Sequence, residues 1–128
     1  MPKHFLSSLD GTCTLTIERS GQMVASNVEI ARDSAARRRG LLGRDSIDRD
    51  QALIIAPSQG IHTFGMRFAI DVIAADRDGR VVKTRSRVAP RRVVLAWSAF
   101  AFIELHLGAL DLIELREGDR LVCAKKYI

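Results

Sequence analysis

The chain has 128 residues, of which 47% are hydrophobic and 27% are charged. This length and composition predict a single globular domain over residues 1–128, and they exclude a disordered chain and a disulfide-dense fold. Twenty Lys and Arg against 15 Asp and Glu give a net charge of +5, which makes this a basic protein. A basic surface attracts polyanions. The aromatic fraction of only 5% argues against nucleic acid as that partner, because single-stranded binders stack bases on aromatic rings.

The first ten residues contain no apolar run long enough for the core of a signal peptide, and no later segment approaches the ~20 apolar residues of a membrane span. We therefore expect a cytoplasmic protein without a membrane span, whose residues 1–10 are poorly ordered, although a trimmed leader would leave the same sequence. Cys13 and Cys123 lie near opposite ends and lack the spacing of a zinc or redox pair. They are predicted to be buried free thiols on terminal strands, and a bridge between adjacent end strands stays open.

Period-two alternation of apolar residues predicts strands over 12–18 and 23–31. The turn at Ser20-Gly21-Gln22 joins them, so an antiparallel hairpin is the simplest arrangement. After this hairpin, Asp33 is expected to cap a short helix over 34–42.

The apolar run at 52–56, which Pro57 stops, predicts a buried strand. An Asp-Gly turn at Asp78-Gly79 then predicts a hairpin whose returning strand covers 81–88. Basic side chains line one face of this returning strand, at Lys83, Arg85 and Arg87. Such a row is typical of the solvated face of an outer strand.

Residues 93–97 are apolar enough to pack over the sheet, 102–107 alternate as a strand, 108–115 fit a short helix, and 121–124 fit a closing strand. The pattern predicts a mainly β fold, with α+β still possible: a compact antiparallel sandwich or partly closed barrel with one or two short helices. A doubly wound fold would need long helices between the strands, and the sequence has none.

The common catalytic and nucleotide-binding signatures are absent from the chain. One set of polar residues nevertheless lies within apolar segments: His62, Arg67, Asp71, Glu104 and His106. Buried charges are usually paired, so we expect Arg67 to contact Asp71 or Glu104. The set fits either an internal network that fixes the sheet or a ligand pocket. Glu104 and His106 could share a metal ion, but a third ligand is missing, and we predict no metal site.

Several blocks of the chain, in order across about 28–122, resemble the domain of unknown function 192 family, also named uncharacterised protein family 0127. The blocks are Arg39-Gly40-Leu41-Leu42-Gly43-Arg44, Ala52-Leu53-Ile54-Ile55, the segment from His62 to Ile73, Ile103-Glu104-Leu105, and Gly118-Asp119. Two positions depart from the family pattern: Ala69 stands where proline is usual, and His106-Leu107-Gly108 replaces Pro-Ala-Gly. The resemblance implies a compact β-rich fold and no established activity.

Three functions are compatible with these residues. The first is a binding module for a small anionic or polar ligand, with a pocket formed by His62, Met66, Arg67, Asp71 and Glu104. The second is an enzyme that uses His62 with Asp71 or Glu104 as acid and base. The third is polyanion binding along the basic residues Lys83, Arg85, Arg87, Arg91 and Arg92. The sequence does not identify a cofactor or an oligomeric state.

Overall fold

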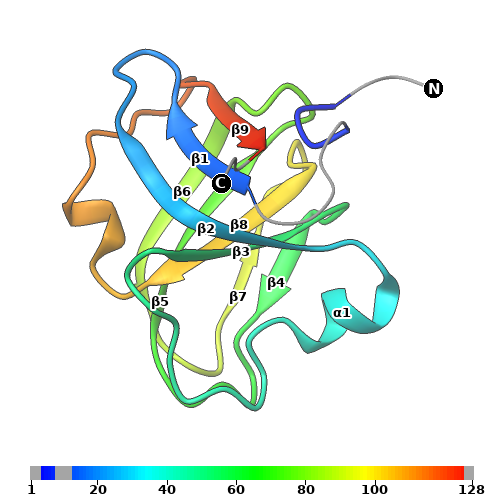
Figure 1. Cartoon of the computed structure of the whole chain (residues 1–128). Helices are drawn as coiled ribbons and strands as arrows, with labels where there is room; N and C mark the ends of the chain where they lie inside the picture. Colours follow the sequence, from blue (N-terminus) through cyan, green and yellow to red (C-terminus); the bar gives the residue numbers. More distant parts are fainter. Residues whose placement is uncertain (1–3, 8–12, 126–128) are drawn as a thin grey trace.

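The structure, a computed structural model, describes residues 4–7 and 13–125, and strands dominate it (Figure 1). The strands are β1 (Cys13–Ile17), β2 (Met23–Ala31), β3 (Gln51–Ile55), β4 (Gly60–His62), β5 (Ile70–Ala75), β6 (Val81–Val88), β7 (Val93–Leu95), β8 (Ala101–His106) and β9 (Leu121–Lys125). The helical elements are the helix α1 (Ser34–Arg39) and the 3-10 helix η1 (Ala109–Asp111). In the part of the chain that the structure describes, no helix is both long and apolar enough to cross a membrane.

Seven strands form one sheet in the order β6-β5-β8-β3-β2-β1-β9, and β4 pairs with β7 in a second, two-stranded sheet. The large sheet curls so that its two ends approach each other (Figure 1). An isolated bridge joins Arg80 to Arg120, and the Val81 amide donates a hydrogen bond to the Asp119 carbonyl at 2.8 Å. The prediction of a mainly β, partly closed barrel is therefore confirmed.

The expected hairpin of β1 and β2 is present, and β2 has the predicted bounds. The next pairing is the exception to the antiparallel pattern, because β2 and β3 run parallel. Parallel neighbours need a crossover connection, and α1 lies in it. The helix is shorter than predicted: Asp33 caps it as expected, but it ends at Arg39 because Gly40 takes a positive φ of 48°.

Two apolar cores lie on opposite faces of the large sheet. One lies in the hollow of the curl and contains Leu15, Ile103 and Leu105. The other contains Leu53 and Phe102 on the opposite face, together with residues of the small sheet. The small sheet thus packs against the second face of the large sheet, and this packing positions the cavity described below.

The structure differs from the sequence-based expectations in three segments. Residues 93–97 do not simply pack over the sheet, because they alternate between buried and exposed side chains. The helix expected at 108–115 is reduced to η1. Of the first ten residues, which we expected to be poorly ordered, 4–7 are described, and Leu6 is buried in the first core. Residues 1–3 and 8–10 lie outside the described residues.

The basic strand β6 is an edge strand of the large sheet, as expected for an outer strand. All three of its basic side chains bind nearby groups of the protein, and Arg85 donates a hydrogen bond to the Thr84 carbonyl at 2.8 Å. Lys83 donates a hydrogen bond to the Leu95 carbonyl, and Arg87, whose φ is 53°, forms an ion pair with Asp111 at 3.1 Å.

The two thiols are free and lie on adjacent end strands, because β1 pairs with β9 and places Cys123 opposite Leu15. Cys13 is buried and Cys123 is partly buried. Burial raises the pKa of both thiols, and the neighbouring Cys13 raises that of Cys123 further.

Candidate functional site

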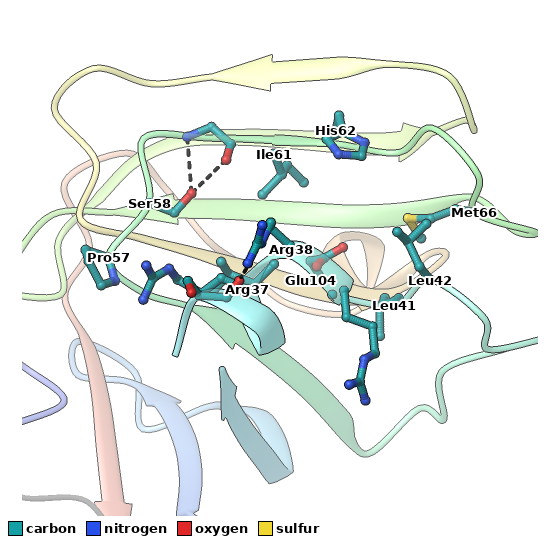
Figure 2. A pocket seen from close by; sticks show the side chains of 15 residues that line it. Arg37, Arg38, Leu41, Leu42, Pro57, Ser58, Ile61, His62, Met66 and Glu104 are labelled. Atoms are coloured by element: carbon teal, nitrogen blue, oxygen red, sulfur yellow. Dashed lines mark hydrogen bonds between the residues drawn. The ribbon is translucent and has the colours of Figure 1, made fainter. Parts of the chain in front are cut away.

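A cavity of about 300 Å³ lies between α1, β4 and β8. Figure 2 shows the side chains that line it, with arginines of α1 on one side and β4 on the other. Apolar side chains form much of its wall: Leu41, Leu42, Ile55, Ile61 and Met66. Several of these belong to the second core, so the cavity is a hollow at the margin of packed apolar structure.

Glu104 supplies a carboxyl group to this cavity from a central strand of the large sheet. Strand β8 pairs with β3 on one side and β5 on the other, where Glu104 lies opposite Leu53 and Val72. The residue is only 2% exposed. Among the described residues, no group donates a hydrogen bond to its carboxyl oxygens. Burial raises the pKa of Glu104 to about 7, although Arg44 acts in the opposite direction.

Arginines at the end of α1 form the basic rim of the cavity, namely Arg37, Arg38 and Arg39. The helix begins at the Asp33 cap, whose carboxylate accepts a hydrogen bond from the Ala36 amide at 2.8 Å. Arg37 donates to the Arg32 carbonyl, and Arg38 donates through Nε to the Ser34 carbonyl at 3.3 Å. The guanidinium groups therefore keep unused donors at the rim of the cavity that Glu104 also lines.

Gly40 lets the chain pass close to Glu104 as it leaves α1. A Cβ atom at Gly40 would lie 3.2 Å from Oε1 of Glu104 and 3.6 Å from Cδ1 of Ile55. The positive φ of 48° also favours glycine at this position. The absence of a side chain thus keeps the space above the carboxyl open.

Strand β4 contributes His62 on the side opposite the helix. The imidazole is exposed, and its Nδ1 accepts a hydrogen bond from the Phe64 amide at 3.3 Å. Met66, which follows the strand, is buried and faces the cavity from the same side (Figure 2). The start of β4 is held by Ser58, whose hydroxyl donates to the Gly60 carbonyl at 2.7 Å.

The structure places Arg67 and Asp71 away from the cavity, so the expected contact of Arg67 with Asp71 or Glu104 is wrong. Arg67 instead forms an exposed ion pair with Asp45 at 2.6 Å. Asp71 is fully buried and accepts hydrogen bonds from the backbone amides of Arg87 and Leu110, each at 2.9 Å. Of the five predicted site residues, the cavity brings together His62, Met66 and Glu104.

His106 shares a face of β8 with Glu104 but does not line the cavity. Its Nδ1 lies 3.0 Å from the carbonyl of Leu107. Within residues 4–7 and 13–125, no group of three or more His, Cys, Asp or Glu side chains is placed to hold a metal ion.

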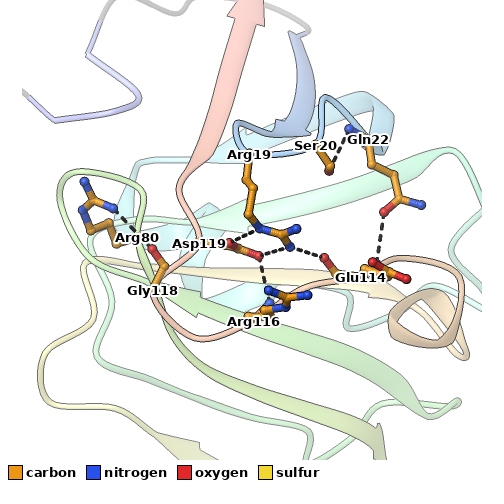
Figure 3. A network of polar contacts seen from close by, with 8 residues as sticks. All are labelled: Arg19, Ser20, Gln22, Arg80, Glu114, Arg116, Gly118 and Asp119. Carbon is orange, nitrogen blue, oxygen red and sulfur yellow. Dashed lines mark hydrogen bonds and ion pairs between the residues drawn. The ribbon is translucent and has the colours of Figure 1, made fainter.

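A separate polar network holds the loop before β9 against the hairpin of β1 and β2 (Figure 3). Arg19 binds the Asp119 carboxylate through two nitrogens, each at 2.9 Å, and donates to the Glu114 carbonyl at 3.0 Å. The Arg19 guanidinium lowers the pKa of Asp119 to about 2, with help from the Arg116 amide. All partners come from neighbouring loops, so this network closes the barrel rather than forming a pocket.

The sequence-based site missed the arginine rim and Gly40. The run of three arginines at 37–39 was visible, but a charge run on a short helix is usually a solvated face. The adjacent Gly40 was a usable signal, since it ends the helix and begins the segment that approaches the buried carboxyl.

Comparison with models of known protein families identifies the family of this chain. The model of the DUF192 family, described as "Uncharacterized ACR", matches residues 15–123. The chain belongs to this family. The earlier resemblance is thereby confirmed, and four of its sequence blocks meet at the cavity. Gly40 belongs to the first block, Ile55 to the second, His62 and Met66 to the third, and Glu104 to the fourth.

Two solved structures are similar to this DUF192 chain. A protein of unknown function from Novosphingobium aromaticivorans has a TM-score of 0.70 and 20% identity, covering 86% of this chain and 82% of that one. A candidate transcription regulator from Sinorhizobium meliloti has a TM-score of 0.77 and 18% identity, covering 96% of this chain and 97% of that one. At these identities the likeness shows the fold alone. No match is found among curated proteins.

Proposed function

We propose that this DUF192 protein is a binding module whose cavity holds a small anionic ligand. The observation that carries the proposal is the Glu104 carboxyl, which is buried beside the cavity, accepts no hydrogen bond from the described residues, and lies opposite the arginine rim of α1. Among the described residues no fully buried side-chain oxygen or nitrogen lacks a partner, so the Glu104 oxygens are open to the cavity that the residue lines. A ligand in the cavity would supply the hydrogen bond that the protein does not.

The groups around the cavity suit an anion with an apolar portion. Guanidinium groups bind carboxylate or phosphate through paired N–H donors, which points to Arg38 and its neighbours for the anionic part. The apolar part would contact Ile55, Ile61 and Met66, which line the same space. The volume of about 300 Å³ is at the small end of ligand pockets, so the ligand is a small molecule.

Glu104 adds a proton dependence to this site. Below pH about 7 its carboxyl is neutral and donates a hydrogen bond to the ligand; above that pH it becomes an anion next to a bound anion. The affinity is therefore expected to fall as the pH rises through about 7.

Amide chemical shifts measured by NMR during titration test the proposal. Benzoate, butyrate and inorganic phosphate are the probes, since they share the anionic group and differ in their apolar part. We expect shifts at Gly40 and Gly60, and roughly tenfold weaker binding in Arg38→Gln, because a charged hydrogen bond contributes about 1.5–3 kcal/mol. Arg49→Gln removes an equal charge outside the cavity and is the matched control. Unchanged spectra with all three probes, or equal losses in the two variants, would contradict the proposal.

An enzyme is the second candidate, and the pKa of Glu104 near 7 favours it, because proton transfer is most efficient near the working pH. His62 lines the same cavity, whereas Asp71 lies on the opposite face of the sheet and is hydrogen-bonded to backbone amides. This candidate is therefore limited to His62 with Glu104. A screen of chromogenic esters and phosphoesters with wild type and Glu104→Gln tests it. Turnover that is equal in the two proteins, or absent from both, would count against it.

A further inference from the structure

The outer face of the small sheet exposes a row of large apolar side chains. Along β7 and the residue pair that follows it, Val93, Leu95 and Trp97 are 57%, 45% and 74% exposed, while Val94 and Ala96 between them are buried. Side chains that alternate in this way belong to a strand with one face packed on the protein and one face in solvent. The solvent-exposed face of such a strand is usually polar, but here it is apolar.

Phe64 extends this row across the small sheet. His62 lies opposite Val93 in the pairing of β4 with β7, and the rings of His62 and Phe64 are 5.9 Å apart. The Leu95 side chain lies directly over Gly60 of β4, since a Cβ atom added at Gly60 would lie only 2.5 Å from Leu95 Cδ2. The apolar side chains therefore form one surface over β4 and β7, which pair side by side (Figure 1).

Basic residues flank the Val93 end of this surface, whereas Asp76 and Asp78 line a hollow with Trp97 at its other end. The segment that contributes the basic residues has no acidic residue. Between Asp78 and Glu104 the sequence has no Asp or Glu, and its cations are Arg80, Lys83, Arg85, Arg87, Arg91 and Arg92. Arg91 and Arg92 immediately precede Val93 and are exposed. In the described part of the chain, neither of them forms an ion pair with a carboxylate. At the other end of the row, Lys83 contacts the Leu95 carbonyl.

The loop that carries these arginines is fixed in place. The amides of Arg91 and Arg92 donate to the carbonyl and hydroxyl of Thr63 at 3.2 and 2.9 Å, and Thr63 is fully buried. The backbone from which the two guanidinium groups project is therefore held beside the apolar row in the free protein.

We propose that this surface, defined by Phe64, Arg91, Arg92, Val93, Leu95 and Trp97, binds the surface of membranes that contain anionic lipid. Tryptophan is favoured at the membrane interface, aliphatic side chains insert at the level of the upper acyl chains, and arginines pair with anionic headgroups. A bilayer accepts such a row without a complementary groove. Single-stranded nucleic acid would need successive aromatic platforms, and the residues between the arginines and Trp97 are aliphatic.

The chain provides its own reporter, because Trp97 is its single tryptophan. Vesicles of phosphatidylcholine, with or without phosphatidylglycerol, are added to the intact protein while its emission and its sedimentation with the vesicles are measured. We expect a blue shift of the emission, reduced quenching by acrylamide and co-sedimentation with the mixed vesicles, and none of these with phosphatidylcholine alone.

Paired variants separate this surface from the general positive charge. The Arg91→Gln/Arg92→Gln variant is expected to bind the mixed vesicles about thirtyfold more weakly, since each arginine near an anionic bilayer contributes about 1 kcal/mol. Arg49→Gln/Arg116→Gln, which removes the same charge elsewhere, is expected to change binding by less than about threefold. Trp97→Ser should weaken binding by about tenfold or more. Leu112→Ser replaces an exposed apolar side chain outside this surface and should leave binding unchanged. Circular dichroism checks that each variant is folded.

Several results would overturn the proposal. These are equal losses in the two arginine variants, an emission shift that follows protein concentration without vesicles, and a shift produced by single-stranded DNA but not by vesicles. The second would identify another copy of the chain as the partner, and the third would identify nucleic acid. Binding of phosphatidylcholine alone with the same affinity would remove the role of the arginines.

Discussion

The carboxyl groups of Asp71 and Glu104 lie on neighbouring strands and on opposite faces of one sheet. In the pairing of β5 with β8, Asp71 lies opposite Leu105 and Glu104 lies opposite Val72, so the two side chains are one register position apart. Asp71 accepts hydrogen bonds from two backbone amides, while Glu104 faces the cavity. We therefore assign a structural role to Asp71 and keep Glu104 in the proposed binding site.

Replacing Asp71 with Ala should strongly destabilise the protein. The change leaves the amides of Arg87 and Leu110 without acceptors inside the structure, and each unsatisfied buried group costs about 1–3 kcal/mol. We expect a loss of roughly 2–5 kcal/mol in the free energy of unfolding, measured with urea. Asp111→Ala breaks only an exposed ion pair and is the control, with an expected loss below about 1 kcal/mol. Similar losses in the two variants would contradict the structural role of Asp71.

Replacing Glu104 with Gln should remove a pH dependence of stability. The pKa of Glu104 is raised from 4.5 to about 7 in the folded protein, so the folded state holds this proton more tightly than the unfolded state does. A carboxyl group whose pKa is higher in the folded state than in the unfolded state stabilises the fold at low pH. This stabilisation is lost as the pH rises from about 4.5 through about 7. The stability of wild type relative to Glu104→Gln should fall by up to about 3 kcal/mol across that window. Parallel pH profiles in urea denaturation would show that the carboxyl is not perturbed.

Most strands could be predicted because their residues alternate strictly and their turns are marked. The bounds of β2 and β6 agree with the predicted ones, and Asp33 caps the helix because a short acidic side chain accepts an amide hydrogen bond at that position. These features depend on residues close together in sequence. Local physics is therefore enough to place them.

The cavity could be predicted only in part, because its geometry depends on pairing between distant strands. A shift of one residue in the register of β5 against β8 would move Asp71 to the face that Glu104 occupies. The true partner of Arg67, Asp45, belongs to a loop whose course no periodicity indicates. Likewise, the arginine rim and Glu104 line the same cavity because β2 and β3 are parallel and their crossover carries α1 over this part of the sheet.

Replacing Gly40 with Ala tests whether the space above Glu104 matters for ligand binding. The new Cβ would lie 3.2 Å from Oε1 of Glu104, which is close enough to displace the carboxyl or a ligand bound to it. Gly43→Ala is a matched control, since Gly43 also has a positive φ but no atom within 4 Å of the added carbon. Both variants should lose about 1 kcal/mol or more of stability from backbone strain. Only Gly40→Ala should weaken binding of the anionic probes. Equal affinities in the two variants would place the ligand elsewhere.

The Arg19–Asp119 pair should protect the fold in acid. Hydrogen bonding to Arg19 lowers the pKa of Asp119 from 3.8 to about 2, so the folded state favours the ionised carboxylate. A lowered pKa gives stability that is present above pH 3.8 and is lost as the pH falls towards 2. We expect Asp119→Asn to lower the Tm at pH 6 and to have a smaller effect near pH 2, measured by circular dichroism. A Tm difference that stays constant over this range would show that the ion pair does not contribute.

Cys13 and Cys123 should react slowly with alkylating agents while the protein is folded. The thiolate is the reactive form, and burial raises the pKa of both thiols, so little thiolate is present at pH 8. We expect iodoacetamide to modify each cysteine at least about tenfold more slowly than it modifies glutathione, and both to react at the rate of glutathione in urea. Peptide mass spectrometry assigns the modified site, which separates the buried Cys13 from the partly buried Cys123. Fast labelling of Cys123 in the folded protein would mean that β9 separates from β1 in solution, whereas no labelling in urea without reductant would mean that the two cysteines are bridged.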